Sequence, residues 1–377
     1  MVLTISFMFL VLYTYIFYPV ILALMAASKR QGNAVGHEKS GEFYPHVSMI
    51  ISAYNEEVHI REKIDNFLAL NYPKEKSELL IGSDGSTDKT VSCVRSFVNE
   101  RIKLFEFPKR RGKVSILNDI AGKAKGSIII FSDADTMYDK DSVKFLVRHF
   151  DRNDVGGVCG RLLLRQTASS LAEEGLYWKY ENFIKEMESR IKTIVGINGQ
   201  IFAIRRELFE PLPEDTITED QALGMRILGR CYNILFDRDA IASEAIGSFR
   251  EEFKRRVRIS AGNFQSIAPS KAVLNPKMGF ASFALWSHKI LRWLAPFFLI
   301  AIFTFSLFSI KTPFFKLLLL SQIIFYLLSL PHYVLTKLGI RISALETIQY
   351  FNLMNLAILI GFFKFLTKTQ KVTWEMA

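Results

Sequence analysis

The feature of this sequence that most constrains its fold is a run at residues 1–27 that contains no charged side chain. About 20 apolar residues are enough to cross the hydrocarbon core of a bilayer as an α-helix. Lys29 and Arg30 follow the run, and basic residues collect on the cytoplasmic side of a membrane span. We therefore predict an N-terminal transmembrane helix that leads into a cytoplasmic segment.

A cleaved signal peptide is the alternative interpretation of this run, because the letters ALMAAS resemble a cleavage site. Against this alternative, the apolar stretch is longer than a signal peptide requires, and no basic residue precedes it. The membrane helix is the better explanation.

Three more apolar segments lie in the C-terminal third of the chain, at residues 291–310, 314–335 and 345–366. Each is near the length that spans a bilayer, and Trp286, Arg292 and Trp293 give the first one the character of a membrane interface. We expect a multi-pass protein of the cell membrane whose catalytic domain is cytoplasmic. Because four spans would leave Lys368 and Lys371 outside, we expect one segment to be re-entrant or interfacial.

These features divide the chain into predicted parts. They are a transmembrane helix at 1–27, a linker at 28–45, a cytoplasmic catalytic domain at 46–262, a membrane-interface segment at 263–290, a C-terminal transmembrane region of about three helices at 291–367 and a tail at 368–377.

The charge balance restricts the partners. The formal net charge of +11 suits nucleic acid, an anionic membrane surface or a polyanionic substrate such as a nucleotide diphosphate. No recognition-helix or aromatic-platform motif supports the first, so we expect no nucleic-acid partner. Cys93, Cys159 and Cys231 have no metal-ligand spacing and are expected to be reduced, buried thiols, which fits a cytoplasmic domain.

Short apolar runs alternate with helical patterns after residue 45. The runs HVSMIISA, LLIGSD, IKLFEF and SIIIF have the length of buried strands, and GGVCGRLLL is a further candidate. Between the first two runs, Ile60, Ile64 and Phe67 share one face of a helix. This alternation predicts an α/β fold with a Rossmann-like, mostly parallel sheet that is covered on both faces.

Acidic and polar turns follow three of the predicted strands. Ligands of an open parallel sheet bind beside the carboxyl ends of its strands, so these turns mark the expected site. We expect Asp88, and not Asp84, to cap the helix after the second strand. Asp133 and Asp135 stand two residues apart and suit a Mg²⁺ or Mn²⁺ ion that bridges to phosphates, and Lys113 suits a phosphate. An isolated Asp-x-Asp pair also recurs by chance, and the neighbouring motifs are what favour a metal site.

Seven motifs stand in order within about residues 46–262: SMIISAYNEE, SDGSTDKT, RRGKVSILN, FSDAD, INGQIFAIRRELF, TEDQALGMRILGR and RRVRISAG. This set resembles the family-two inverting glycosyltransferases of GT-A fold. More specifically, it is similar to the membrane-embedded branch that includes the cellulose, hyaluronan and poly-N-acetylglucosamine synthases. The resemblance implies a GT-A catalytic domain, a nucleotide-sugar donor, a Mg²⁺ or Mn²⁺ cofactor and inversion at the transferred sugar.

The resemblance also implies roles for individual residues. It assigns the nucleotide sugar to Ala53, Tyr54, Glu56, Asp84, Lys113 and Asp133, the divalent ion to Asp135 with Asp133, the general base to Asp220, and the acceptor side to Glu219, Asn198 and Gly199. Taken in isolation, Glu219 and Asp220 also suit the N-terminus of a helix, where the dipole favours acids. Asn198 and Gly199 likewise suit a turn between two strands.

The basic run FKRRVRISAGNFQ departs from the family pattern. In the synthase branch this position carries Gln-x-x-Arg-Trp, in which the glutamine and arginine face the diphosphate and the tryptophan stacks on the acceptor sugar. Here Arg255 replaces the glutamine, Arg258 matches the arginine and Ile259 replaces the tryptophan. Guanidinium groups suit phosphate oxygens, so the diphosphate role is retained, whereas loss of the ring implies a different acceptor. Binding of anionic lipid headgroups is the alternative role of this run.

From these motifs we expect a membrane-bound, metal-dependent, inverting glycosyltransferase that moves a sugar from a UDP-sugar to a growing polysaccharide or glycan at the cell surface. Transfer of a single sugar to a lipid-linked acceptor is the alternative within this class. A transporter or channel whose soluble domain senses nucleotide is the alternative from another class. The expected partners are the donor, a glycan or lipid-linked acceptor, membrane lipids, and a homo-oligomer or export partner.

Overall fold

The computed structural model describes residues 1–29, 43–165, 176–245, 249–329 and 342–372. Contacts within the chain divide it into two compact units. The first unit comprises Met1–Leu24, Ser248–Phe264 and Ala284–Gln370, and the second comprises Met25–Gly247, Gln265–Phe283 and Lys371–Ala377. The second unit contains the sheet, and the first contains most of the apolar helices.

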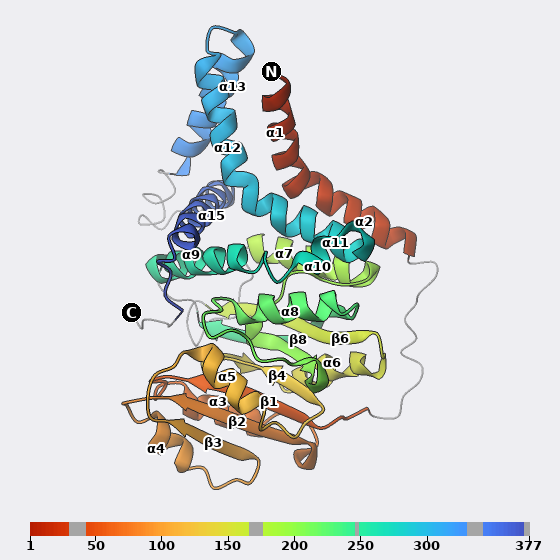
Figure 1. Ribbon diagram of the computed structural model, residues 1–377, viewed down its shortest axis with the longest axis vertical. Coiled ribbons are helices and arrows are strands. Elements are labelled where there is room, and N and C mark those ends of the chain that lie inside the picture. Colours follow the sequence, from red (N-terminus) through yellow and green to blue (C-terminus); the bar gives the residue numbers. More distant parts are fainter. Residues whose placement is uncertain (30–42, 166–175, 246–248, 330–341, 373–377) are drawn as a thin grey trace. The chain divides into compact units, whose positions relative to one another are not determined.

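In the described residues, the second unit is built on an eight-stranded sheet of order β3-β2-β1-β4-β7-β6-β8-β5 (Figure 1). Its strands are β1 (Val47–Ala53), β2 (Ser77–Asp84), β3 (Ile102–Phe107), β4 (Ile128–Phe131), β5 (Met137–Tyr138), β6 (Val155–Arg165), β7 (Phe202–Arg205) and β8 (Asn233–Ala245). The pairs β1–β2, β1–β4, β2–β3 and β6–β8 are parallel, whereas β4–β7, β6–β7 and β5–β8 are antiparallel. The predicted α/β class with a mostly parallel sheet is confirmed.

The predicted apolar runs form β1, β2, β3, β4 and β6. Every residue of β2 and β4 is buried. This is expected of parallel strands in a sheet that is covered on both faces. β5, β7 and β8 were not predicted. β7 is only four residues long, and the charged residues Asp237, Arg238 and Asp239 interrupt the apolar pattern of β8.

The helices of the second unit cover the sheet. They are α3 (Ile60–Leu68), α4 (Thr90–Arg95), α5 (Lys113–Ala121), α6 (Ser142–Val147), α7 (Leu176–Ile191), α8 (Glu219–Gly229) and α10 (Lys271–Leu274), with 3₁₀ turns η2 (Lys74–Lys76), η3 (Arg148–Asp151), η4 (Gly199–Ile201), η5 (Arg206–Leu208) and η6 (Pro276–Met278). The α3 side chains Ile60, Ile64 and Phe67 pack into the core with residues of β1. A Cβ atom added at Gly82 of β2 would stand 2.2 Å from Ile116 Cγ2 of α5, so this glycine allows α5 to lie directly on the sheet.

The strand order reverses beside β1. The chain passes from β1 outward to β2 and β3, and then crosses to β4 on the opposite side of β1. In open α/β sheets, ligands bind at the carboxyl ends of the strands on either side of such a reversal. Ala53 ends β1 and Ser132 follows β4, so the acidic turn that contains Asp133 and Asp135 stands at this point.

Among the described residues, three helices are long and apolar enough to cross a membrane: Val2–Lys29, Phe280–Phe308 and Ser343–Leu366. They are built from α1 (Val2–Leu12), π-helix η1 (Tyr13–Phe17) and α2 (Tyr18–Lys29); from α11 (Phe280–Ala284), π-helix η7 (Leu285–Ile290) and α12 (Leu291–Phe308); and from α15 (Ser343–Leu366). The predicted apolar helices of spanning length at both ends of the chain are confirmed.

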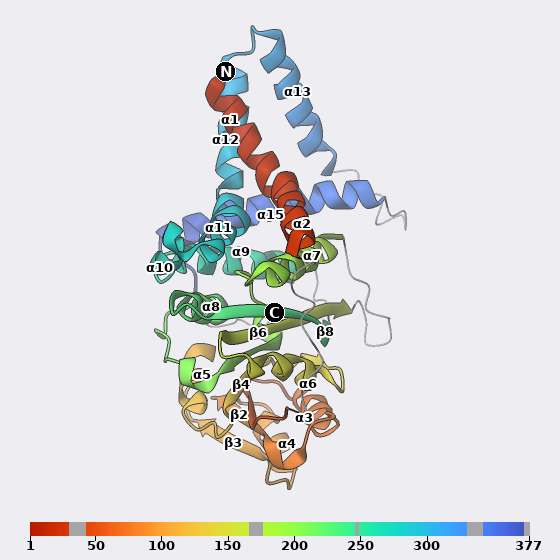
Figure 2. The ribbon, with the colours of Figure 1, turned by 90° about the vertical axis from the view of Figure 1, so that its right-hand side faces the viewer.

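The remaining helices of the first unit are α9 (Phe249–Gln265), which ends one residue beyond it, and the shorter apolar α13 (Pro313–Leu327). The predicted segment 314–335 extends beyond α13 into residues 330–341, which lie outside the described residues. Figure 2 shows α1 beside α12, and α15 running across α12 and α13 instead of along them. The expectation that one segment is re-entrant or interfacial remains a prediction. The domain boundaries remain a prediction.

Candidate active site

An aromatic ring and a guanidinium group are in contact beside the carboxyl end of β1. Ala53 is fully buried, and the Arg110 guanidinium carbon lies 3.8 Å from the centroid of the Tyr54 ring. Glu56 follows: its backbone N–H donates to Thr90 Oγ1 at 2.7 Å, and its carboxylate contacts His59 Nδ1 at 3.0 Å. The hydrogen bond to Glu56 raises the pKa of His59 above its ordinary value, although partial burial opposes the shift.

Asp84, at the carboxyl end of β2, shapes the turn that precedes Lys113. Its two carboxylate oxygens accept the backbone N–H groups of Arg111 at 2.6 Å and Gly112 at 2.8 Å. Gly112 has a φ of 95°, a left-handed conformation that favours glycine. The predicted cap of the next helix falls on Asp88, which accepts Thr90 N–H at 2.9 Å in the first turn of α4. Asp84 thus anchors the basic turn, and its predicted contact with the nucleoside remains a prediction.

Lys113 contacts acidic side chains from two separate parts of the chain. Its Nζ lies 2.7 Å from Asp133 Oδ1 and 2.5 Å from Glu219 Oε1. The two carboxylates raise the pKa of Lys113 although burial opposes the shift, so the side chain is a cation at any physiological pH. A residue at the start of α5 therefore connects the acid after β4 with the acid at the start of α8.

The turn Ser132–Asp133–Ala134–Asp135–Thr136 is held from below by α3. Lys63 of α3 is fully buried, and its Nζ donates to Ser132 Oγ at 2.8 Å and to the Thr136 carbonyl. Desolvation lowers the pKa of Lys63 to about 7, and the charges of Asp133 and Asp135 oppose that shift. Lys63 is therefore close enough to the acidic turn for the charges of Asp133 and Asp135 to affect its pKa.

The donor set of the acidic turn fits a hard divalent cation. Mg²⁺ and Mn²⁺ take oxygen ligands and are usually held by one or two carboxylates together with substrate phosphates. Asp133 and Asp135 supply the carboxylates, while no cluster of three or more His, Cys, Asp or Glu side chains that suits a metal occurs in the part of the chain that the structure describes. A cation here would thus share its coordination with a bound phosphate, as the sequence predicts.

Asp220 lies in the first turn of α8. Its carboxylate accepts the backbone N–H groups of Gln221 at 2.8 Å and Gly199 at 3.0 Å. Burial, assisted by the neighbouring charge of Glu219, raises the pKa of Asp220 to about 6. A carboxyl group with this pKa is ionised at neutral pH and remains basic enough to accept a proton.

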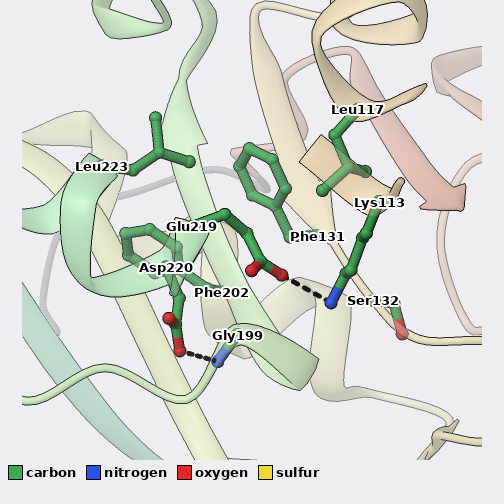
Figure 3. A pocket seen from close by; sticks show the side chains of 9 residues that line it. All are labelled: Lys113, Leu117, Phe131, Ser132, Gly199, Phe202, Glu219, Asp220 and Leu223. Atoms are coloured by element: carbon green, nitrogen blue, oxygen red, sulfur yellow. Dashed lines mark hydrogen bonds and ion pairs between the residues drawn. The ribbon is translucent and has the colours of Figure 1, made fainter. Parts of the chain in front are cut away.

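Lys113, Glu219 and Asp220 meet in one pocket (Figure 3). It is lined by Lys113, Leu117, Phe131, Ser132, Gly199, Phe202, Glu219, Asp220 and Leu223. Figure 3 shows the Glu219 carboxylate and the Lys113 ammonium directed at one another, and Asp220 directed at the Gly199 amide. The structure thus brings together residues from α5, the end of β4, η4 and α8, which are widely separated in the sequence.

The roles of the other predicted site residues remain predictions. Asn198 is buried; its Oδ1 accepts from Lys185 Nζ at 2.6 Å, and its Nδ2 donates to the Gly160 carbonyl at 3.2 Å. Glu219, predicted on the acceptor side, lines the pocket and is paired with Lys113. Arg255 and Arg258 lie on α9 in the first unit, and their contact with a diphosphate remains a prediction.

Lys63 is a buried neighbour of the acidic turn that the sequence analysis did not identify. It was passed over because a lysine in an amphipathic helix is expected to face solvent. A signal was nevertheless present, since positions 60, 63, 64 and 67 together form the i, i+3, i+4, i+7 pattern of a buried helical stripe. A charged residue inside such a stripe indicates that its side chain has a polar partner in the protein interior.

The sheet and its covering helices have the GT-A type of fold. A mannosyltransferase of Pyrobaculum calidifontis, solved in complex with GDP-mannose and Mn²⁺, has the same fold, with a TM-score of 0.74 and 22% identity over 97% of this chain and 99% of that one. Residues 48–212 match the family model of glycosyl transferase family 2. This part of the chain is therefore a glycosyl transferase family 2 domain.

Two curated relatives support this assignment. The chain is 30% identical over 247 residues to the probable glycosyltransferase YdaM of Bacillus subtilis and 27% identical over 230 residues to a poly-β-1,6-N-acetyl-D-glucosamine synthase of Staphylococcus epidermidis. Each alignment covers 58% of this chain and 55% of the relative. The chain therefore matches little more than half the length of these relatives.

Gly199 is expected to be sensitive to a single added methyl group. A Cβ atom there would lie 3.1–3.2 Å from three side-chain atoms of Asp220, which would have to move by a few tenths of an ångström. Small misplacements of a reacting group are costly, so we expect Gly199→Ala to lower kcat about 10-fold. Gly122→Ala is the control, because its Cβ would make only ordinary contacts, the nearest at 3.6 Å. Equal activity of the two variants would contradict this expectation.

Glu219 is expected to set the acidic limb of the pH–rate profile. Asp220 is basic only when ionised, so activity should fall as the pH drops through about 6, the pKa of Asp220. The negative charge of Glu219 raises that pKa, so Glu219→Gln should lower it and move the midpoint of the limb to lower pH. The measurement is kcat between pH 4.5 and 8 for both proteins. A midpoint that stays in place or rises would contradict this assignment, whatever the change in maximal rate.

Proposed function

We propose that this protein is a membrane-bound, divalent-metal-dependent, inverting glycosyltransferase that moves a hexose from a nucleotide sugar, a UDP-sugar, to a growing glycan at the cell surface. The observation that supports this most is the arrangement around Lys113. One partly buried cation lies between an acid of the metal-type turn, Asp133, and the acid pair that begins α8, Glu219 and Asp220. Such a set of residues can bind a donor phosphate, hold a divalent ion and accept a proton.

The donor side requires positive charge where the leaving group departs. When the bond between the sugar C1 and the diphosphate breaks, the nucleoside diphosphate leaves with the electron pair and gains negative charge. The Lys113 ammonium stabilises that charge, and Asp84 holds the turn from which Lys113 projects. Asp135 and Asp133 would hold Mg²⁺ or Mn²⁺, which supplies Lewis-acid stabilisation of the same phosphates. Tyr54, with Ala53 and Glu56 nearby, receives the nucleoside.

The acceptor side requires a base. Asp220 takes the proton of the acceptor hydroxyl as that oxygen attacks C1 from the side opposite the diphosphate, and this geometry inverts the configuration at C1. Two backbone amides fix the carboxylate, so little reorganisation is needed when the hydroxyl arrives. Asn198 and Gly199 form the neighbouring wall of the acceptor side, and Arg255 and Arg258 contact the diphosphate.

A single-sugar transfer to a lipid-linked acceptor is the second candidate. Its support is Ile259, which stands where the polymer-forming branch has a tryptophan that stacks on the acceptor sugar. The similarity to a poly-N-acetylglucosamine synthase favours the polymer instead. In both versions the apolar helices anchor the chain in the cell membrane, with the catalytic domain in the cytoplasm and with a second copy or an export protein as partner.

The test is a donor screen on the purified full-length chain in lipid nanodiscs. UDP- and GDP-sugars are supplied with Mg²⁺ or Mn²⁺, and release of the nucleoside diphosphate is measured. We expect release from a UDP-sugar that requires a divalent ion. Radiolabelled donor and native membrane lipid then separate the two acceptors by the size of the product. Absence of release from every donor would contradict the proposal and favour a protein that only senses nucleotide.

A further inference from the structure

Lys63 lies in an unusual place for a charged side chain. It belongs to the buried stripe of α3, is fully inaccessible to solvent and is surrounded by the core residues Ile60, Ile64 and Phe67 of the same helix. A buried ammonium is costly unless its donors are satisfied. The groups that satisfy it therefore indicate what the residue does.

Both hydrogen bonds of the ammonium go to the acidic turn. Ser132, whose Oγ accepts at 2.8 Å, directly precedes Asp133, and Thr136, whose carbonyl oxygen accepts the other bond, directly follows Asp135. One ammonium thus joins the two ends of a five-residue segment that contains both metal-type carboxylates. The backbone bond from Thr136 N–H to the Asp133 carbonyl, at 3.3 Å, closes the same segment from within.

A second residue of α3 holds the continuation of this turn. Asn66 donates to the Tyr138 carbonyl at 2.8 Å and accepts the Tyr138 N–H at 2.8 Å. The Tyr138 ring lies 4.6 Å from Lys63 Nζ, and its hydroxyl donates to the Phe131 carbonyl at 3.1 Å. Successive turns of α3 therefore fix the acidic turn at both of its ends.

We propose that Lys63 is a positioning residue for the divalent cation: its two hydrogen bonds hold the Asp133–Asp135 turn in the conformation that binds the metal. It is not itself a ligand in this role, because its side chain is fully buried and its Nζ donates to Ser132 Oγ and to the Thr136 carbonyl. Groups that orient metal ligands commonly contribute 10–100-fold, roughly, to metal affinity. This inference rests on the proposed function, since it requires that the turn binds a metal.

The variant Lys63→Met tests this inference, because it retains a flexible chain of similar length and removes both the charge and the two hydrogen bonds. Lys103→Met is the matched control: Lys103 of β3 pairs with Glu78 at 2.6 Å and makes no contact with the acidic turn. Mn²⁺ binding is measured on each full-length protein by the electron paramagnetic resonance signal of free Mn²⁺, in the presence of UDP and separately of GDP. The midpoint of thermal unfolding is recorded for the same samples.

We expect Lys63→Met to raise the Mn²⁺ dissociation constant about 10–100-fold, while Lys103→Met leaves it at the wild-type value. A purely structural lysine would change the unfolding midpoint and leave the Mn²⁺ affinity of the folded protein unchanged, which would overturn the inference. If wild-type protein binds no Mn²⁺ with either nucleotide, the proposed function fails and the inference fails with it.

If Lys63→Met does not fold, Ser132→Ala removes one partner of the ammonium at little change in volume. Unchanged Mn²⁺ affinity of that variant would overturn the inference, and a weaker affinity would support it.

Discussion

Replacement of Asp220 by asparagine is expected to lower kcat about 10²–10⁴-fold while changing the donor KM little, because a general base contributes to the reaction step and not to donor binding. Asparagine keeps the shape of the side chain, and its single carbonyl oxygen can still accept one of the Gly199 and Gln221 N–H groups that bond the two oxygens of the aspartate. Only one hydrogen bond is lost, so the fold should persist. The measurement is the rate of nucleoside diphosphate release at saturating donor and acceptor.

Asp215→Asn is the control for this variant. Asp215 is exposed, lies five residues before Asp220 and lines no part of the pocket. It should retain wild-type activity. A kcat of Asp220→Asn within a few-fold of the control would remove the base from the mechanism.

Replacement of Asp135 by asparagine is the second large effect that we expect. An amide is a much poorer ligand than a carboxylate for Mg²⁺ or Mn²⁺, and metal stabilisation of a leaving diphosphate accounts for several kcal/mol of the barrier. We expect activity at ordinary Mn²⁺ concentrations to fall about 10²–10³-fold. Part of the loss should be recovered by raising Mn²⁺, so the measurement is rate as a function of Mn²⁺ concentration.

Asp65→Asn, at an exposed position of α3, controls for the loss of one negative charge. Its Mn²⁺ dependence should match that of the wild type. If Asp135→Asn shows an unchanged Mn²⁺ dependence and an unchanged rate, the acidic turn does not hold the metal.

The strands around the switch point could be predicted because each is a short apolar run followed by a polar turn. β1, β2 and β4 are buried along nearly their whole length, so composition alone identifies them. β8 could not be found in this way, because its charged residues are satisfied locally: Asp237, for example, is paired with Arg148 at 2.7 Å. Charges that find partners within the fold remove the periodicity on which sequence interpretation depends.

The sequence motifs predicted residues of the site, but they did not predict which of their side chains contact one another. The resemblance assigned Lys113 to a phosphate and Glu219 to the acceptor side, yet in the structure these two side chains form an ion pair. Their meeting depends on how α5 and α8 approach across the sheet, which no local pattern encodes. Lys63 was missed for the same reason, since the oxygens that accept its hydrogen bonds lie about seventy positions further along the chain.

We propose that Asp133, Asp135, Lys113 and Asp220 serve a single bound nucleotide sugar. The decisive measurement is a crystal structure with Mn²⁺ and the donor selected by the screen, in which the anomalous signal of manganese locates the ion. We expect the ion beside Asp135 and Asp133, a donor phosphate beside Lys113, and the sugar C1 facing the pocket that Asp220 lines. Manganese or donor density on a different part of the chain, with the acidic turn empty at saturating Mn²⁺, would contradict it.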